Sequence, residues 1–414
     1  MKKINLLFLS TFTVISANAQ QIIDTVSTGA GYANQQWYSL ANDEQGLSPK
    51  NNWDIAFETS SQGSSIHINS STGVELWVHP TAGATDFATL DTTGLSTWSK
   101  LYNSNQIWET GAFNQAADTS NSFDLGWGAY NMITHTVDGN RVFIVKLPGS
   151  IYRKIIIENL AGGVYNFRFA SIDNSVDVSE TITKATFNTK NFVYFSLLNN
   201  QLIDREPASL NWDITFTQYI EFIPSAYLVT GILHNKNIES VKVQPVLDPA
   251  NYNDWQSQTF STDINTVGYN WKSFNMGTFQ WEFSDSTVYF VKDRDDNIWK
   301  LIFTGFGGSS TGNYIFSKEN VTTVSVKENM NKNLILNVYP NPATTSIQVT
   351  YHTKEANTNI NLVDVTGKII LTKNTINQGD LNQELIDVSN VSKGIYILAI
   401  TSENYTSTQK LIIQ

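Results

Sequence analysis

Short runs in which large apolar residues alternate with polar or small ones recur along this chain, a pattern typical of β-strands buried on one face. The clearest runs are 53–57 (WDIAF) and 212–216 (WDITF). The alternation predicts that the tryptophan, isoleucine and phenylalanine of each run share one face of a strand. Residues 142–145 (VFIV) are apolar throughout, which predicts a strand buried on both faces. The turn-forming residues at 147–150 then predict a hairpin.

The patterned segments occur twice, in the same order. The corresponding segments, first copy before second, are 37–40 and 194–197, 52–57 and 211–216, 127–132 and 271–276, 142–146 and 288–292, and 151–154 and 298–301. A period of about 150 residues is the size of a domain and far longer than the unit of a solenoid repeat. We therefore predict two tandem antiparallel β domains, at 20–190 and 191–320, the second divergent from the first.

Composition supports an all-β chain and narrows its partners. Only 15% of the 414 residues are charged, 12% are aromatic and 24 are glycine, a balance that favours sheets over helices. The net charge of −11 repels phosphate backbones, so we expect no nucleic-acid partner. Cysteine is absent, which removes disulfides, thiolate nucleophiles and cysteine metal sites. Stability must come from buried cores, for which the chain is long enough.

The N-terminus has the pattern of an export signal. Lys2 and Lys3 precede an apolar stretch at 4–17, and small residues follow at 17–19. This pattern predicts a secretory signal peptide at 1–19, with the mature chain starting at Gln20. No later run approaches the ~20 apolar residues of a membrane helix, so we predict no transmembrane helix.

The C-terminal segment carries a second set of recognisable motifs. A polar stretch at 321–333 reads as a linker, and the segment 334–414 then contains, in order, 337–342 (NVYPNP), 365–368 (VTGK), 393–396 (KGIY) and a final 410–414 (KLIIQ). This segment resembles the type A C-terminal sorting domain of proteins exported by the type IX secretion system. The resemblance implies a small β-sandwich, recognition by the type IX secretion machinery, and a protein that is secreted or held at the outer-membrane cell surface.

The two repeats carry a resemblance of their own. A WDIAF strand, a Tyr-Asn motif and a VFIVK hairpin, spread over about residues 35–175 and more faintly over 193–317, resemble the HmuY-like family of secreted haem-binding proteins. The resemblance implies an all-β fold of two tandem antiparallel domains. It also implies haem held between two axial side chains, which are histidines in some members and methionines in others. These motifs consist mainly of core and turn residues, so they support the fold more directly than the ligand.

The candidate haem ligands are His79 and His135, since imidazole commonly holds haem iron. His135 follows the Tyr-Asn motif, where the family often carries a histidine. His79 has an expected counterpart in the second repeat, His234, by matching 76–79 with 231–234. The turn at 70–73 predicts a hairpin that places His67 on the opposite face from His79. The alternative is that these are ordinary surface or loop histidines.

Met132 is the reserve candidate for haem iron, because a thioether also serves as an axial ligand. It occupies the same position as Met276 in the second repeat. A packing slot shared by the two repeats explains that match equally well.

The tryptophans offer a different chemistry. All 11 lie between Trp37 and Trp299, and most should be core residues. Trp98 and Trp108 lie in segments rich in Ser, Thr and Asn, so we predict that they are exposed, as a stacking platform for sugars or a porphyrin would be.

No pair of carboxylates has a context that suggests acid–base catalysis, so we do not expect an enzyme. The sequence supports two readings. The first is a non-enzymatic exported protein whose HmuY-like domains bind haem through His79 and His135. The second is a surface adhesion or glycan- or protein-binding module without haem.

Overall fold

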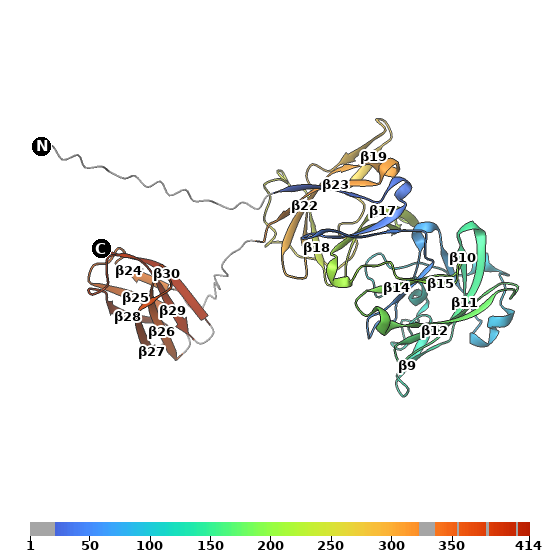
Figure 1. Ribbon diagram of the computed structural model, residues 1–414, viewed down its shortest axis with the longest axis horizontal. Coiled ribbons are helices and arrows are strands. Elements are labelled where there is room, and N and C mark those ends of the chain that lie inside the picture. Colours follow the sequence, from blue (N-terminus) through green and yellow to red (C-terminus); the bar gives the residue numbers. More distant parts are fainter. Residues whose placement is uncertain (1–20, 323–335, 354–355, 378–380, 403–404) are drawn as a thin grey trace. The chain divides into compact units, whose positions relative to one another are not determined.

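The computed structural model describes the chain except for residues 1–20, 323–335, 354–355, 378–380 and 403–404 (Figure 1). The expected signal peptide and almost all of the expected linker lie outside the described residues. The chain forms two compact units, up to Thr322 and from Thr323. Named strands in both units pair antiparallel, and the α-helix of the described part, α1, is a single turn at Gly308–Thr311. The predicted all-β fold class is confirmed.

The N-terminal unit contains two lobes, each built around its own apolar core. In the first lobe a sheet of order β15-β14-β4-β5 contributes to one core with a sheet of order β13-β12-β11-β10-β6-β7. The strands of the smaller sheet are β4 (Ile55–Glu58), β5 (Ile66–Ile68), β14 (Phe192–Ser196) and β15 (Gln201–Ile203). Those of the larger sheet are β6 (Glu75–Val78), β7 (Lys100–Leu101), β10 (Phe143–Leu147), β11 (Ile151–Ala161), β12 (Val164–Ser171) and β13 (Asp177–Thr183).

The second lobe repeats this arrangement. A sheet of order β17-β16-β2-β3 and a sheet of order β1-β23-β22-β21-β18 share its core. The strands of the first are β2 (Asn34–Ser39), β3 (Asp43–Pro49), β16 (Ile214–Phe222) and β17 (Ala226–His234). Those of the second are β1 (Ile22–Ser27), β18 (Glu239–Val243), β21 (Val288–Lys292), β22 (Ile298–Phe306) and β23 (Asn313–Asn320).

The two repeats exchange their first strands. The WYSL strand β2 of the first repeat pairs with the WDITF strand β16 of the second, and Tyr38 lies opposite Ile214. In return, the YFSL strand β14 of the second repeat pairs with the WDIAF strand β4 of the first, and Phe195 lies opposite Ile55. The two registers are equivalent, because Tyr38 and Phe195 hold the same place in their repeats, as do Ile214 and Ile55.

This exchange corrects the expected boundaries. Strands β1 to β3 lie in the range 20–190 but complete the second lobe, and β13 to β15 complete the first lobe although β14 and β15 lie beyond residue 190. Sequence similarity located the repeats, but it carries no information on which copy of a strand pairs with which partner sheet. The first lobe is therefore the continuous block β4 to β15, inserted between two parts of the second.

A buried aspartate fastens each exchanged strand. The carboxylate of Asp54 accepts hydrogen bonds from the Leu198 amide and the Ser196 hydroxyl, both 3.1 Å away. Asp213 accepts one from the amide of Leu40 at 2.8 Å. The Asp of each Trp-Asp-Ile motif thus holds the Ser-Leu end of the strand donated by the other repeat. Burial raises the pKa of Asp54, against the opposing effect of these hydrogen bonds.

Hairpins lie at corresponding places in the two repeats. The predicted hairpins after 142–146 and 288–292 are β10–β11 and β21–β22. The match of 151–154 with 298–301 is off by one residue, because the two turns differ in length. The register makes Lys154 and Lys300 equivalent, opposite Ile144 and Phe290. Both lysines are buried, and each ammonium donates to a backbone carbonyl, that of Ala88 or of Ala250.

The C-terminal unit consists of two sheets that enclose one core. The sheet orders are β24-β25-β28 and β27-β26-β29-β30. Their strands are β24 (Leu336–Tyr339), β25 (Ser346–His352), β26 (Asn357–Asp364), β27 (Ile369–Ile376), β28 (Leu381–Asp387), β29 (Gly394–Ser402) and β30 (Tyr405–Ile413). The Asn341 side chain of the NVYPNP motif donates to the Lys410 carbonyl and accepts from the Ile412 amide, so it fixes the last strand.

We expect Asp54→Ala to lower the free energy of unfolding of the N-terminal unit by about 1–3 kcal/mol, because it leaves the Leu198 amide and the Ser196 hydroxyl without their partner. All 11 tryptophans lie in this unit, so tryptophan fluorescence during denaturant unfolding of the full chain reports on it. Asp91→Ala is the matched control, since Asp91 is exposed and its carboxylate bonds only within its own turn. Equal stability of the two variants would contradict the anchoring role.

Candidate ligand-binding cleft between the lobes

The predicted haem ligands do not meet in one site. His79 follows β6, and its Nδ1 accepts hydrogen bonds from the amides of Thr81 and Ala82 at 3.2 and 2.8 Å. A neutral imidazole whose Nδ1 is an acceptor carries its proton on Nε2, so neither nitrogen of His79 offers a lone pair to iron in this arrangement. The ring instead packs edge-on against Trp98, 4.5 Å between centroids.

His135 lies in the turn between β8 (Gly128–Asn131) and β9 (Thr136–Gly139), with Nδ1 hydrogen-bonded to the Tyr130 hydroxyl. Strand register separates this turn from β6. Val78 is level with Ile155 of β11 through Phe143, whereas Val137 of β9 pairs with Leu160.

The step from residue 155 to residue 160 is roughly 16 Å at 3.3 Å per residue, and His135 lies further along in the same direction. Two axial nitrogens on one iron are roughly 4 Å apart. The register therefore does not support His79 and His135 as a pair that holds one haem.

Two further sequence expectations need correction. His234 corresponds in position to Ile68, since each lies opposite the isoleucine of its Trp-Asp-Ile motif, and it is not the counterpart of His79. The turn at 70–73 closes no hairpin: β5 pairs with β4 in the smaller sheet, and β6 pairs with β10 in the larger one. The chain crosses there from one sheet to the other.

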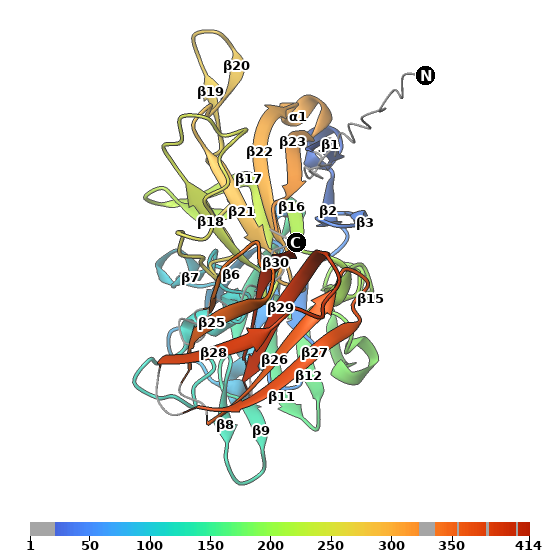
Figure 2. The same cartoon turned by 90° about the vertical axis from the view of Figure 1, so that its left-hand side faces the viewer.

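The reserve candidate Met132 and its match Met276 do not occupy a packing slot. They lie in equivalent turns of the hairpins β8–β9 and β19–β20, with β19 at Lys272–Asn275 and β20 at Gln280–Phe283, and are 63% and 72% exposed. These hairpins project from their lobes (Figure 2).

A cleft forms where the lobes meet. Its cavity volume is about 90 Å³. One wall comes from the first lobe and contains Trp53, His67 and Trp108, and the opposite wall is the outer half of β16 at 217–220. Trp53 was expected on the face of Ile55 and Phe57, but the strand begins only at Ile55, and Trp53 packs instead with the cluster around Ala56 on the other face.

Aromatic rings dominate the first wall. Trp53 and Tyr194 meet at 4.9 Å between centroids in an edge-on contact. Trp108 is half-buried and donates from its indole nitrogen to the carbonyl of His234, which fixes it across the lobes at 2.9 Å. Trp108 was predicted to be exposed and is partly exposed. Trp98 was also predicted to be exposed, but it is buried, so that prediction was wrong.

His67 is a polar residue of the cleft lining. Its Nε2 lies 2.8 Å from the carbonyl of Trp108, which only accepts, so Nε2 carries the proton. Burial lowers the pKa of His67 to about 4, so the ring is neutral near pH 7. Nδ1 is then a lone-pair acceptor, and it has no hydrogen-bond partner among the described residues. The sequence analysis only placed His67 on the opposite face from His79, because it read the sheet crossing at 70–73 as a hairpin turn.

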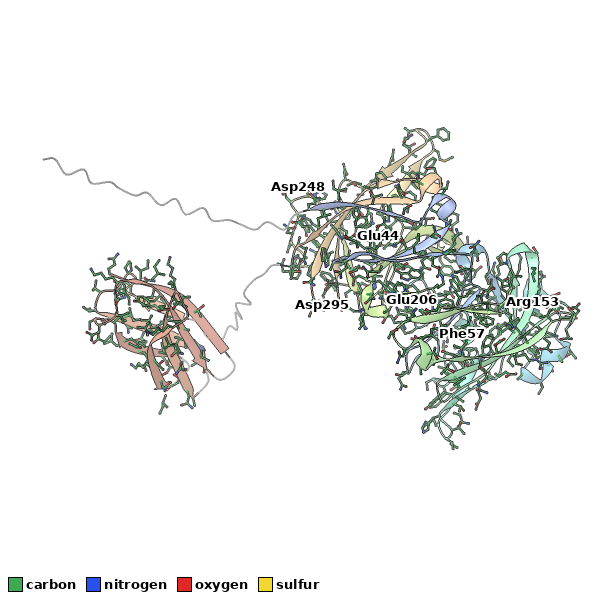
Figure 3. All side chains as sticks on the ribbon, in the orientation of Figure 1. Glu44, Phe57, Arg153, Glu206, Asp248 and Asp295 are labelled. Atoms are coloured by element: carbon green, nitrogen blue, oxygen red, sulfur yellow. The ribbon has the colours of Figure 1, made fainter. Side chains whose placement is uncertain are left out.

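Arg205 and Glu206 both contact Tyr194 of the aromatic wall, and Glu206 lies where the lobes join (Figure 3). The Arg205 guanidinium lies 4.9 Å from the Trp37 ring centre and 5.0 Å from that of Tyr194, and it donates to the Gln35 side chain at 2.8 Å. Glu206 accepts from the Tyr194 hydroxyl at 2.8 Å. Burial raises the pKa of Glu206 to about 7, against the opposing effect of its hydrogen bonds and of Arg205.

The cleft has the chemistry of a site for an uncharged ligand. None of the described residues that line it is Asp, Glu, Lys or Arg, and His67 is neutral. Among the described residues there is also no group of three or more His, Cys, Asp or Glu that could hold a metal ion. The lining combines aromatic rings with the amide and hydroxyl groups of Asn, Gln, Ser and Thr.

Comparison with known proteins identifies the C-terminal unit. Residues 337–414 match the family described as a secretion system C-terminal sorting domain. The chain is therefore a cargo of the type IX secretion system, exported to the cell surface or secreted. No helix in the described part of the chain is long and apolar enough to cross a membrane. The match covers neither repeat, so the HmuY-like resemblance stays a prediction.

Other comparisons add little. A search of curated proteins found no match. Similar solved structures include PorZ, an essential bacterial surface component of the type IX secretion system of Porphyromonas gingivalis, at 9% identity and TM-score 0.15 over 69% of this chain and 44% of that one. Dimeric latent PorU of the same organism is similar at 10% identity and TM-score 0.17, over 94% of this chain and 34% of PorU. This chain therefore spans less than half the length of either PorZ or PorU. The BSP domain of a biofilm associated protein is similar at 11% identity and TM-score 0.17, over 99% of this chain and 84% of that domain. TM-scores this low establish no shared fold.

We expect the buried carboxyl of Glu206 to make stability depend on pH. Its pKa of about 7 when folded exceeds the usual 4.5, so folding favours the protonated acid. This stabilisation is complete below pH 4.5 and is lost as the pH rises through 7, at about 1.4 kcal/mol for each unit of pKa shift.

Denaturant unfolding at about pH 5 and pH 8 checks this, with Glu206→Gln as the comparison, because the amide cannot ionise. The natural protein should lose stability relative to Glu206→Gln at the higher pH. A constant difference between the two proteins would contradict the shifted pKa.

Proposed function

We propose that this protein is a non-enzymatic binding protein, exported by the type IX secretion system, that binds a neutral saccharide in the cleft between its lobes. The observation that carries the proposal is the lining itself: Trp53, Trp108 and Tyr194 beside amide and hydroxyl groups, with no formal charge. Flat aromatic rings bury the apolar face of a sugar ring, and the neighbouring polar groups pair with its hydroxyls.

Hydrogen-bonding capacity also supports this ligand. The buried hydroxyl of Ser70, which lines the cleft, has no hydrogen-bond partner among the described residues. Buried polar groups normally pair, so a ligand or water that supplies hydroxyl groups satisfies it. A purely apolar ligand would leave it unpaired, at a cost of roughly 1–3 kcal/mol.

Binding is favoured over hydrolysis because hydrolysis of a glycosidic bond requires a pair of carboxylates that flank it. The described residues that line the cleft contain no carboxylate. Glu206, an acid with a raised pKa beside the lining residue Tyr194, is buried and already hydrogen-bonded to Tyr194 and the Asn191 amide. Glu206 therefore belongs to the contact between the two lobes and not to the lining of the cleft.

We expect Trp108→Ala to weaken saccharide binding about tenfold or more, because it removes a stacking surface. Isothermal titration calorimetry with the best ligand from an array of neutral glycans measures the effect. Trp255→Ala is the matched control: Trp255 is also half-buried and donates its indole N–H to a carbonyl, that of Val321, but it belongs to another cluster. An array without any bound neutral glycan would overturn the proposed function.

Haemin provides a contrasting ligand for the same preparation. Because the register keeps His79 and His135 apart, we expect that the double variant His79→Ala, His135→Ala leaves the haemin absorption spectrum of the protein unchanged. A Soret band that is present in the natural protein and lost in the double variant would restore the haem hypothesis.

A further inference from the structure

A lysine in the second lobe is buried under a surface loop. The side chain of Lys300 lies between those of Ile298 and Ile302 on one face of β22, because alternate residues of a strand share a face. Both isoleucines belong to an apolar cluster that also contains Tyr252 and Trp255 of the loop between β18 and β19. Lys300 is only 2% exposed, so its ammonium group needs acceptors within the fold.

Three oxygen atoms surround the ammonium nitrogen of Lys300, and two of them belong to side chains. The carbonyl of Ala250 lies 2.8 Å away. Oδ1 of Asn253 lies 3.1 Å away, and Oε2 of Glu319, which is directly opposite Lys300 on β23, lies 2.6 Å away. A carboxamide C=O bond is about 1.2 Å long, so the carbonyl carbon of Asn253 is roughly 3.3–4.3 Å from the nitrogen. Atoms poised to react lie about 3–3.5 Å apart, at the near end of this range.

The equivalent lysine of the first lobe lacks both of these side-chain neighbours. Lys154 is also buried, and its ammonium donates to the carbonyls of Ala88 and Leu90. Among the described residues no carboxamide or carboxylate lies within hydrogen-bonding distance of that ammonium. Backbone carbonyls alone therefore suffice to bury a lysine at this place in the fold. The amide and the carboxylate beside Lys300 need another explanation.

We propose that Nζ of Lys300 and the side-chain carbonyl carbon of Asn253 become joined by an isopeptide bond, with Glu319 moving the protons. Glu319 takes one proton from the ammonium, and the resulting amine attacks the carbon. As the new carbon–nitrogen bond forms, the bond from that carbon to Nδ2 breaks. Of the three ammonium protons, one stays on the new amide, one leaves with Nδ2 as ammonia, and one remains on Glu319 until water removes it. The reaction needs no oxidant, metal or other reactant.

The surroundings of the three groups suit this reaction. Nδ2 of Asn253 has no hydrogen-bond partner among the described residues, and Asn253 is exposed, so ammonia can leave to solvent. The chain has no cysteine, so a disulfide cannot cross-link it. The isopeptide bond fastens the loop between β18 and β19 to the middle of β22, and a cross-link stabilises a fold by restricting the unfolded chain. The bond forms whether or not the cleft holds a saccharide.

Peptide mapping of the full mature chain by mass spectrometry tests the bond. We expect a branched peptide that joins the segments around Asn253 and Lys300 and is lighter than their sum by one ammonia. The map is needed besides the intact mass, because an N-terminal glutamine such as Gln20 can lose ammonia as well. Asn253→Ala, at an exposed position where folding tolerates substitution, and Glu319→Gln should each yield only the two linear peptides.

Lys242 and Asn270 are a matched control within the same map. Their Nζ and Oδ1 atoms are also 3.1 Å apart, but among the described residues no carboxylate pairs with Lys242, so these two segments should stay linear. Linear peptides alone from the natural protein would overturn the bond and leave Lys300 in a buried ion pair. A branched peptide that persists in Glu319→Gln, or that joins Lys242 to Asn270, would overturn the role of Glu319.

Discussion

Each lobe of the N-terminal unit is closed by strands that belong to the other repeat, and the remaining features depend on this exchange. β2 completes the sheet of β16, and β14 completes that of β4, in equivalent registers. The exchanged strands bring Tyr194 of the second repeat next to Trp53 of the first. Without the exchange these rings would belong to separate bodies, and the aromatic wall of the cleft would not exist.

The joint between the lobes is asymmetric although the repeats are alike. Trp37 and Tyr194 hold equivalent places in the two exchanged strands, yet a single guanidinium, that of Arg205, lies against both. Cation–π contacts of a partly desolvated guanidinium contribute on the order of 1–2 kcal/mol each. Lys236 adds a second cross-link through its pair with the buried Glu58 at 2.5 Å. His67 of the first repeat corresponds to Leu233 of the second, so the duplicated fold carries a polar cleft wall in one copy only.

The sequence predicted what depends on local periodicity. The strands around the Trp-Asp-Ile motifs, the hairpin after 142–146 and the equivalence of the repeats follow from alternation and turn residues, and the sorting domain follows from its motifs. The exchange could not be predicted, because Phe195 and Tyr38 are nearly interchangeable as partners of Ile55 and Ile214. Of the residues that line the cleft, the sequence singled out only Trp108, as an exposed ring that could stack on a ligand.

The other cleft residues carried no signal in the sequence. His67 becomes part of the site only because the chain changes sheets after β5, and Ser70 only because that turn approaches β16. The haem pair His79 and His135 was predicted because each histidine suited its motif. The distance between them depends on strand register, however, and no sequence motif reports strand register.

The pairing of the first and last strands of the N-terminal unit has a consequence for the order in which the chain folds. β1 pairs with β23, and the hydroxyl of Ser27 reaches the carbonyl of Thr311, 284 residues away. Contacts of such long separation form late, since a large loop must close before they are made. The second lobe therefore stays open until synthesis has passed β23, just before the C-terminal unit. Until then the core of this lobe, to which β1 contributes Val26 and β23 contributes Phe316, cannot be completed.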